Sequence, residues 1–102
     1  MRNMLMTRAI EHKMPKLYAQ DSKGDSAIAY VKYFTPRSNW TWYGTEYDPI
    51  ERMFFGLVIG FEPELGYFSL DELEEMARKG KVERDLYFDP TTIGQLREQY
   101  ER

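Results

Sequence analysis

The chain has 102 residues, a formal net charge of −3, one histidine and no cysteine, and its length corresponds to one domain over residues 1–102. Without cysteine, disulfide scaffolds, thiolate metal sites and cysteine nucleophiles are excluded, and a single histidine leaves few other metal or acid–base designs. No apolar run reaches the about 18 residues of a membrane helix. We therefore expect a cytoplasmic domain with no cofactor, no metal and no membrane partner.

The N-terminal third predicts a helix, a loop and a strand. Residues 7–13 predict a short helix, because Thr7 can cap it and Pro15 follows where a helix interior would reject proline. Residues 21–26 combine Asp, Ser and Gly and predict a mobile loop. Residues 27–35 carry β-branched and aromatic side chains up to a proline and predict a strand.

Two further strands follow at residues 40–47 and 52–61, and the second of these has the clearest apolar alternation in the chain. The connections are short, which permits hairpins and excludes parallel crossovers, so the three strands predict an antiparallel meander. Gly56 and Gly60 lie four residues apart on one face of the third strand. We expect a helix or a tryptophan to pack against that side, because glycine lets another group approach closely.

The C-terminal third predicts a helix at about 69–79, which begins with a Ser-x-x-Glu capping box and ends at Gly80. Residues 82–88 fit a fourth strand, and Asp89-Pro90 can open a last helix. The sequence therefore predicts an α+β fold. Its antiparallel three- to four-stranded meander is packed by the helix at about 69–79 and accompanied by short N- and C-terminal helices.

Charge divides unevenly along the chain. Residues 1–37 hold seven Lys or Arg against three acids, a net +4, whereas residues 38–102 hold seven against fourteen, a net −7. Such a division can present a basic patch to a phosphate backbone or an acidic surface to a basic partner, or it can arise from ordinary solvated surfaces.

Aromatic residues are concentrated on the meander, since twelve of the sixteen fall between Tyr30 and Phe68. They can form the core of a domain poor in aliphatic residues, anchor a protein interface or stack single-stranded bases. The nucleic-acid hypothesis would use Trp40, Trp42 and Tyr43 for stacking, with Lys13, Lys16, Lys32 and Arg37 as phosphate contacts. It is the less favoured of the binding hypotheses, because Arg52 is the one cation within residues 38–68.

Two pairs of carboxylates are the remaining candidates for enzymatic chemistry, namely Glu46 with Asp48 and Glu62 with Glu64. Paired acids can perform acid–base catalysis or hold a divalent cation, as a metal-assisted hydrolase requires. At about 3.3 Å per strand residue the pairs would lie roughly 30 Å apart, at opposite ends of the third strand. They are therefore not expected to form one site, and solvated turn residues are the simpler interpretation.

Several segments of the chain carry specific residue patterns, namely Ala29–Pro36, Asn39–Tyr43 with Glu46, Phe55–Val58 and Glu62–Phe68, supported by Pro15–Tyr18, Glu83–Asp85 and Asp89–Thr91. In this order they resemble a bacterial family known as domain of unknown function 2958. The resemblance covers about residues 7–97. It implies no established activity and no catalytic residues. It does imply an association with plasmids, integrative elements and phages, often near genes for DNA processing or anti-restriction.

We therefore predict a non-enzymatic protein-binding or inhibitory module, an anti-defence or DNA-processing accessory that uses an acidic surface. The alternatives are a single-stranded nucleic-acid-binding module and a metal-assisted hydrolase. The candidate binding residues are Trp40, Trp42, Tyr43, Glu46, Asp48, Glu62, Glu64 and Tyr67. If Trp40 or Trp42 stands exposed among other rings, an interface is indicated; if both are buried, the stacking hypothesis loses its basis.

Overall fold

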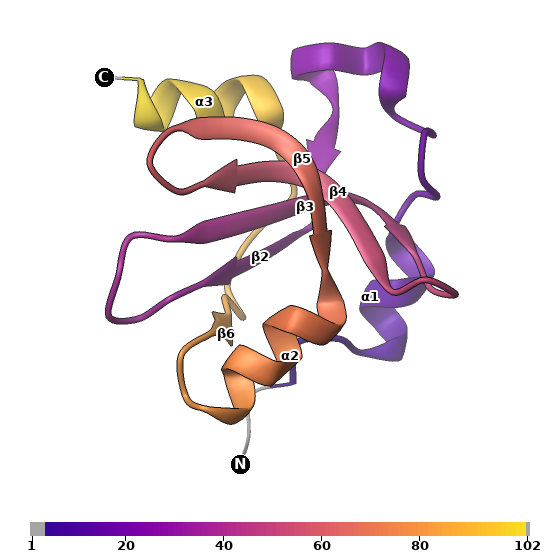
Figure 1. Cartoon of the computed structure of the whole chain (residues 1–102). Helices are drawn as coiled ribbons and strands as arrows, with labels where there is room; N and C mark the ends of the chain where they lie inside the picture. The colour runs from indigo at the N-terminus through magenta and orange to yellow at the C-terminus, as the bar shows by residue number, and fades with distance from the viewer. Residues whose placement is uncertain (1–3, 102) are drawn as a thin grey trace.

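The computed structural model describes residues 4–101 and has an α+β fold, as predicted. Its main sheet has five antiparallel strands in the order β5-β4-β3-β2-β6, and a small second sheet pairs β1 with β7 (Figure 1). In chain order the elements are α1 (Arg8–Lys13), the 3₁₀ segment η1 (Asp21–Ser26), β1 (Ile28–Ala29), β2 (Val31–Phe34), β3 (Thr41–Asp48), β4 (Met53–Ile59), β5 (Pro63–Ser69), α2 (Leu70–Arg78), β6 (Glu83–Arg84), β7 (Thr91–Thr92) and α3 (Ile93–Tyr100).

Side-chain caps begin the first two helices where the sequence predicts them. The Ile10 amide donates to the Thr7 hydroxyl at the start of α1, and the Glu72 amide donates to the Ser69 hydroxyl at the start of α2. Gly80, at φ 73°, ends α2. Its amide and that of the next residue donate back to carbonyls of the last helical turn, which is the Schellman arrangement.

The second half of the chain corrects three expectations. β5 was not predicted, because a proline and a glycine within seven residues are typical of turns, whereas an edge strand tolerates both. The strand expected at 82–88 is only Glu83–Arg84, paired with β2. The last helix begins at Ile93 instead of at Asp89-Pro90, because Thr92 caps it and forms a full capping box with Gln95.

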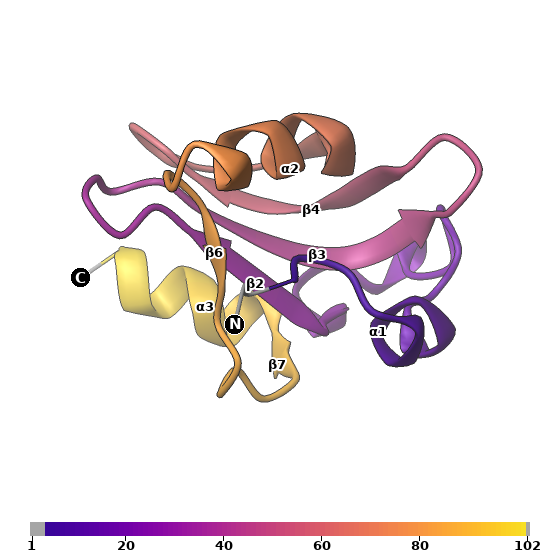
Figure 2. The same cartoon turned by 90° about the horizontal axis from the view of Figure 1, so that it is seen from below.

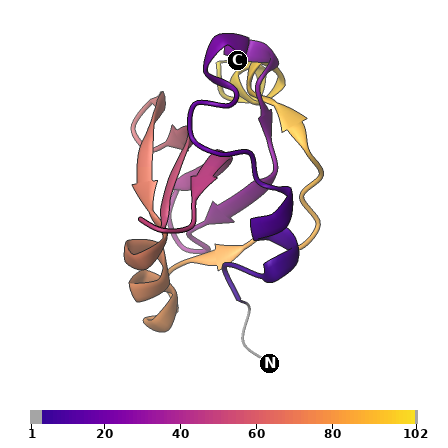
Figure 3. The same ribbon diagram turned by 90° about the vertical axis from the view of Figure 1, so that its right-hand side faces the viewer.

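The segment at residues 21–26 is a further correction. It was expected to be a mobile loop, but it forms the 3₁₀ segment η1, interrupted at Gly24, where φ is 52°. Arg97 of α3 forms an ion pair with Asp25 at 3.4 Å. Figure 3 shows η1 beside α3, at the end of the molecule away from α2. None of the helices within residues 4–101 is long and apolar enough to cross a membrane.

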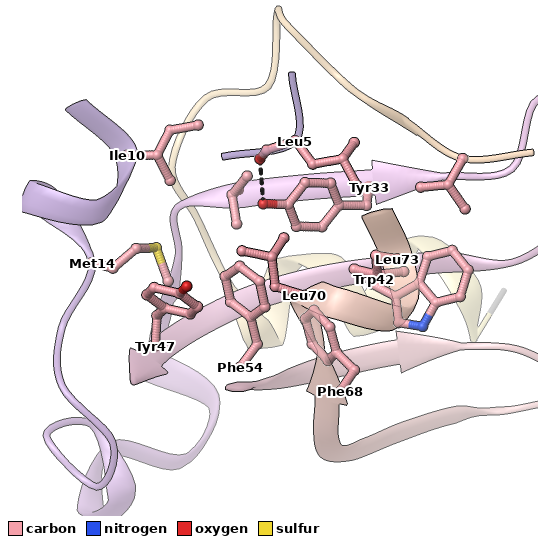
Figure 4. Packing of buried hydrophobic residues seen from close by; sticks show 12 residues of the cluster. Leu5, Ile10, Met14, Tyr33, Trp42, Tyr47, Phe54, Phe68, Leu70 and Leu73 are labelled. Atoms are coloured by element: carbon pink, nitrogen blue, oxygen red, sulfur yellow. Dashed lines mark hydrogen bonds between the residues drawn. The ribbon is translucent and has the colours of Figure 1, made fainter. Parts of the chain in front are cut away.

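The main sheet has a helix on each face, with α2 on one side and α3 on the other (Figure 2). The α2 face carries a core of aromatic rings, in which Phe54 stacks on Phe68 with ring centroids 4.9 Å apart. Tyr33 crosses this core and donates its hydroxyl to the Leu5 carbonyl at 2.6 Å (Figure 4). The core on the α3 face is smaller and consists of Ala27, Ala29, Tyr43, Leu57, Ile59, Ile93 and Leu96.

A β-bulge and two glycines shape the meander. The register between β3 and β4 shifts between Gly44 and Glu46, which leaves Thr45 as the extra residue. A Cβ atom on Gly56 would lie 1.8 Å from the Tyr43 carbonyl oxygen, and one on Gly60 would lie 2.4 Å from the Trp40 ring. The predicted tryptophan therefore does pack at Gly60, while the neighbouring strand's backbone occupies the space at Gly56.

Candidate functional site

Trp40 stands exposed among other rings, directly before β3. Its side chain is 38% exposed and stacks on Trp42, with centroids 6.1 Å apart and planes at 27°. Phe61, in the turn between β4 and β5, meets the Trp40 ring edge-on at 5.8 Å and is itself 96% exposed. We name these three residues the aromatic ridge. Trp40 thus meets the condition set out for the tryptophans, exposure among other rings, whereas Trp42 is buried.

Two hairpin turns position the aromatic ridge. In the β2–β3 turn, the Trp40 amide donates to the Thr35 hydroxyl at 3.1 Å, and the Thr35 amide donates to the Trp40 carbonyl at 3.0 Å. On the neighbouring strand, Gly60 leaves the space that the Trp40 ring fills. Backbone hydrogen bonds and close packing thus fix the position of the Trp40 ring. Because the ring is already ordered, it would lose little conformational entropy on contact with another molecule.

A groove with a basic rim lies on one side of the aromatic ridge. It encloses about 540 Å³ and is lined by Thr35, Pro36, Arg37, Ser38, Trp40, Trp42, Met76, Lys79, Gly80 and Lys81. We name it the basic groove, because three cations and no carboxylate line it. Lys79 also pairs with Glu75 of α2 at 3.9 Å, on the exposed surface of the helix.

A smaller acidic hollow lies on the other side. It encloses about 290 Å³ and is lined by Trp40, Val58, Gly60, Phe61, Glu62 and Glu64. Glu64 is opposite Val58, and Val58 is opposite Trp42, in adjacent strands, so both acids border the same end of the sheet as the ridge. Trp40 contributes to both depressions and thus separates surfaces of opposite charge.

Two other candidate residues, Trp42 and Tyr43, are buried, and they point to opposite faces of β3. Trp42 belongs to the aromatic core on the α2 face, and its ring stacks on that of Trp40, so it connects Trp40 with this core. The Tyr43 hydroxyl hydrogen-bonds that of Tyr100 at 2.8 Å, and burial together with this bond raises the pKa of Tyr43. Tyr43 therefore offers no ring for a base to stack on, contrary to the nucleic-acid hypothesis.

Glu46 is also buried, and both of its carboxylate oxygens are occupied. The Tyr18 and Gln20 amides donate to them at 2.8 Å each. The Gln20 side chain in turn bonds the backbone of Ile28 and Thr45, at distances from 2.7 to 2.8 Å. Glu46 thus anchors the segment that follows α1 to the bulge of β3, and its carboxylate lies in the interior of the fold.

The remaining candidates, Asp48 and Tyr67, lie away from the ridge. Asp48 accepts a hydrogen bond from the Ile50 amide at 2.9 Å in the β3–β4 turn. Tyr67 lies on β5, where its ring contacts Phe55 edge-on at 5.0 Å on the α3 face. A hydrogen bond with the Tyr18 hydroxyl raises the pKa of Tyr67. Of the eight predicted residues, the structure therefore brings together Trp40, Trp42, Glu62 and Glu64.

The cations of the site differ from those expected. Arg37 lines the basic groove, but Lys32 pairs with Asp85 at 3.6 Å and lies 5.8 Å from the centroid of the Tyr43 ring, on the α3 face. Sequence reasoning missed Lys79, Lys81 and Phe61. The sequence could have indicated the two lysines, because they flank Gly80, which ends the predicted helix, and so both lie at the C-terminal end of α2.

Within the described part of the chain, no three Asp, Glu or His side chains gather as metal ligands would. The first carboxylate pair is engaged within the fold, because both oxygens of Glu46 accept amides and one oxygen of Asp48 accepts the Ile50 amide. Glu62 and Glu64 border the aromatic ridge as a pair without a third ligand. Neither predicted carboxylate pair is therefore part of a larger cluster of ligands among the described residues.

The family comparison covers this whole region. A family model described as protein of unknown function (DUF2958) matches residues 4–96, which include the aromatic ridge, the basic groove and the acidic hollow. No curated protein and no solved structure matches the chain. Because the match spans most of its length, the chain belongs to the DUF2958 family, whose function is unknown.

Proposed function

We propose that this protein is a cytoplasmic, non-enzymatic protein-binding module whose contact surface is centred on the aromatic ridge. The observation that carries the proposal is the exposure of Trp40 and Phe61 in a fixed, mutually packed arrangement. Aromatic residues dominate the energetic hot spots of protein interfaces. Their rigid rings supply contact area with little loss of side-chain entropy.

Charge on both sides of the ridge supports a protein partner. A nucleic-acid strand would favour cations throughout, whereas Glu62 and Glu64 border the ridge on one side and Arg37, Lys79 and Lys81 on the other. Opposite charges at an interface steer association and reject wrong partners. The expected acidic surface thus becomes, in this proposal, one flank of the contact. Service to a mobile element, by inhibition or as an accessory, rests on the family resemblance.

The test compares two exposed aromatic residues. Phe61→Ala truncates the ridge, whereas Tyr87→Ala removes a ring that is 91% exposed elsewhere and serves as the control. Immobilised wild-type protein is incubated with bacterial host lysate at low and high salt. We expect a protein that is retained by the wild type and by Tyr87→Ala, lost with Phe61→Ala and weakened by salt. Recovery of no salt-sensitive partner, or equal recovery with both variants, would contradict the proposal.

Single-stranded nucleic acid is a second candidate, because the basic groove places three cations beside the Trp40 ring without a carboxylate. Titration with an oligothymidylate at low salt, followed by tryptophan emission, distinguishes the two. Binding that quenches Trp40 and is lost in Arg37→Glu would favour the nucleic-acid function. Unchanged emission together with no retarded band in a gel would leave the protein-binding function alone.

A further inference from the structure

The outer edge of β5 offers a second surface, independent of the aromatic ridge. Within residues 4–101, β5 pairs with β4 alone and forms one edge of the five-stranded sheet (Figure 1). At the two ends of this pair, the Leu70 amide donates to the Arg52 carbonyl and the Gly60 amide to the Glu62 carbonyl. Hydrogen-bonded positions alternate along antiparallel strands. The even-numbered residues of β5 therefore bond to β4, and the backbone groups of Leu65 and Tyr67 face outward.

Of the features that normally prevent strands from pairing, this edge has one, the proline at its first position. Monomeric proteins protect their edges with lysine, proline, bulges or a covering element. In β5 the proline is confined to the first position, the run Leu65–Phe68 has no charge, and the bulge lies in β3. Leu65 is 45% exposed and Tyr67 is 54% exposed. An open backbone edge is thus combined with exposed apolar side chains.

The sequence of β5 is complementary to itself about Gly66. A two-fold axis at this residue would place Leu65 of one copy opposite Tyr67 of the other, twice, with both residues on the α3 face. The backbone groups of Leu65 and Tyr67 face outward, so each Leu65–Tyr67 pair would be a hydrogen-bonded pair. The two Gly66 residues would form the non-hydrogen-bonded pair between them, with Cα atoms about 4.5 Å apart. A Cβ at Gly66 meets no atom within 4 Å, so the approach is unobstructed.

Charge does not oppose this register. Glu64 would lie opposite Phe68 of the second copy, so no like charges would meet directly across the pair. The Leu65 and Tyr67 side chains would join Phe55, which already contacts Tyr67, in an apolar strip that continues across the axis. Neighbouring registers are less favourable, because a shift of the axis to Tyr67 would set Leu65 against Ser69 and leave it without an aromatic partner.

We propose that this protein forms a two-fold symmetric dimer in which the β5 strands pair antiparallel about Gly66 and join the two sheets into one. The partner at this edge is a second copy of the chain, because the β5 strand of that copy would place its Tyr67 against the exposed Leu65 and its Leu65 against Tyr67. The dimer leaves the residues of the aromatic ridge unchanged, and the proposal stands or falls separately from the protein-binding function.

Sedimentation equilibrium tests the dimer. At concentrations up to about 0.5 mM, the wild type is expected to approach twice the 12.2 kDa mass of the chain. Leu65→Lys places a charge on the exposed edge and should raise the dissociation constant at least about tenfold, while circular dichroism stays unchanged. A monomeric wild type, or a dimer that Leu65→Lys leaves intact, overturns the proposal.

A cross-linking experiment defines the register. The chain has no cysteine, so Gly66→Cys introduces one thiol at the proposed axis, where open space accepts it. Ile50→Cys, on the exposed β3–β4 turn, is the control for random collision. Under mild oxidation Gly66→Cys should form a covalent dimer at least about ten times faster than Ile50→Cys. Equal rates for the two variants would contradict pairing about Gly66.

Discussion

The α2 face of the sheet carries aromatic rings at both ends, yet only one end is covered. Around Phe54, rings from β3, β4 and β5 pack under α1 and α2 and exclude water. At the other end, Trp40 and Phe61 meet edge-on at 5.8 Å, much as Tyr33 and Phe54 do at 5.6 Å in the core, but they remain exposed because α2 ends at Gly80 beside the groove. Ring packing alone therefore does not distinguish covered rings from exposed ones, and the position of the helix end does.

The largest expected difference between the two ends is in stability. Phe54→Ala removes a fully buried ring that contacts three others and should lower the free energy of unfolding by about 3–5 kcal/mol. Phe61→Ala should change it by at most about 0.5 kcal/mol. Urea denaturation followed by far-UV circular dichroism measures both. Comparable losses would mean that the ridge is part of the core.

The next effect concerns the glycine under the ridge. Gly60→Ala forces its new methyl group into the Trp40 ring and should cost about 1–3 kcal/mol or expel the ring. Gly66→Ala, where the space is open, is the matched control and should cost well under that. Acrylamide quenching of tryptophan emission reports the displaced ring. An unchanged quenching constant and unchanged stability in Gly60→Ala would show that Trp40 is not fixed.

The pH dependence of stability probes the covered end of the sheet through Tyr33. Burial raises the pKa of Tyr33 far above its ordinary 10.0, so the folded state keeps the phenol neutral after the unfolded chain has begun to ionise. The stability from this group is complete below pH 10 and is lost as the pH rises further, by up to about 1.4 kcal/mol per pH unit. Tyr33→Phe should reduce that slope. An equal slope in both proteins would contradict the burial argument.

The smallest expected effect is at the turn that holds Trp40. Thr35→Val keeps the shape of the side chain but removes the hydroxyl that accepts the Trp40 amide. Because this hydrogen bond is solvent-exposed, the loss should be about 0.5–1 kcal/mol, with increased quenching of Trp40 and no change around Phe54. Near-ultraviolet circular dichroism and quenching test this. A loss above about 3 kcal/mol would place the turn among the core elements.

Local signals predicted those parts of the fold that depend on nearby residues. The cap at Ser69, the stop at Gly80 and the alternation of β4 each depend on contacts within a few positions, and all three are present. β5 escaped notice because Pro63 and Gly66 resemble turn residues, and only the pairing with β4 shows that this stretch is extended. Strand pairing is a property of two segments, so one segment alone cannot indicate it.

The candidate site was predicted in part for a similar reason. Trp40 and Trp42 share a face in the sequence pattern, and that relation is correct. Which of them is exposed depends on where α2 ends, more than thirty residues later. Glu46 resembles a surface acid until the amides of Tyr18 and Gln20 are brought to it by the fold. Burial of a charge is decided by its distant partners, which composition does not reveal.

The bulge at Thr45 explains why the core and the ridge share one side of the sheet. Successive residues of a regular strand alternate, so Trp42 and Tyr47, an even and an odd position, would face opposite sides. The extra residue reverses this phase, and both rings face α2. In β3, even-numbered residues therefore face α2 before the bulge and odd-numbered residues face α2 after it. A single-residue insertion or deletion at the bulge would change which chemistry each half presents, while most of the sequence stayed the same.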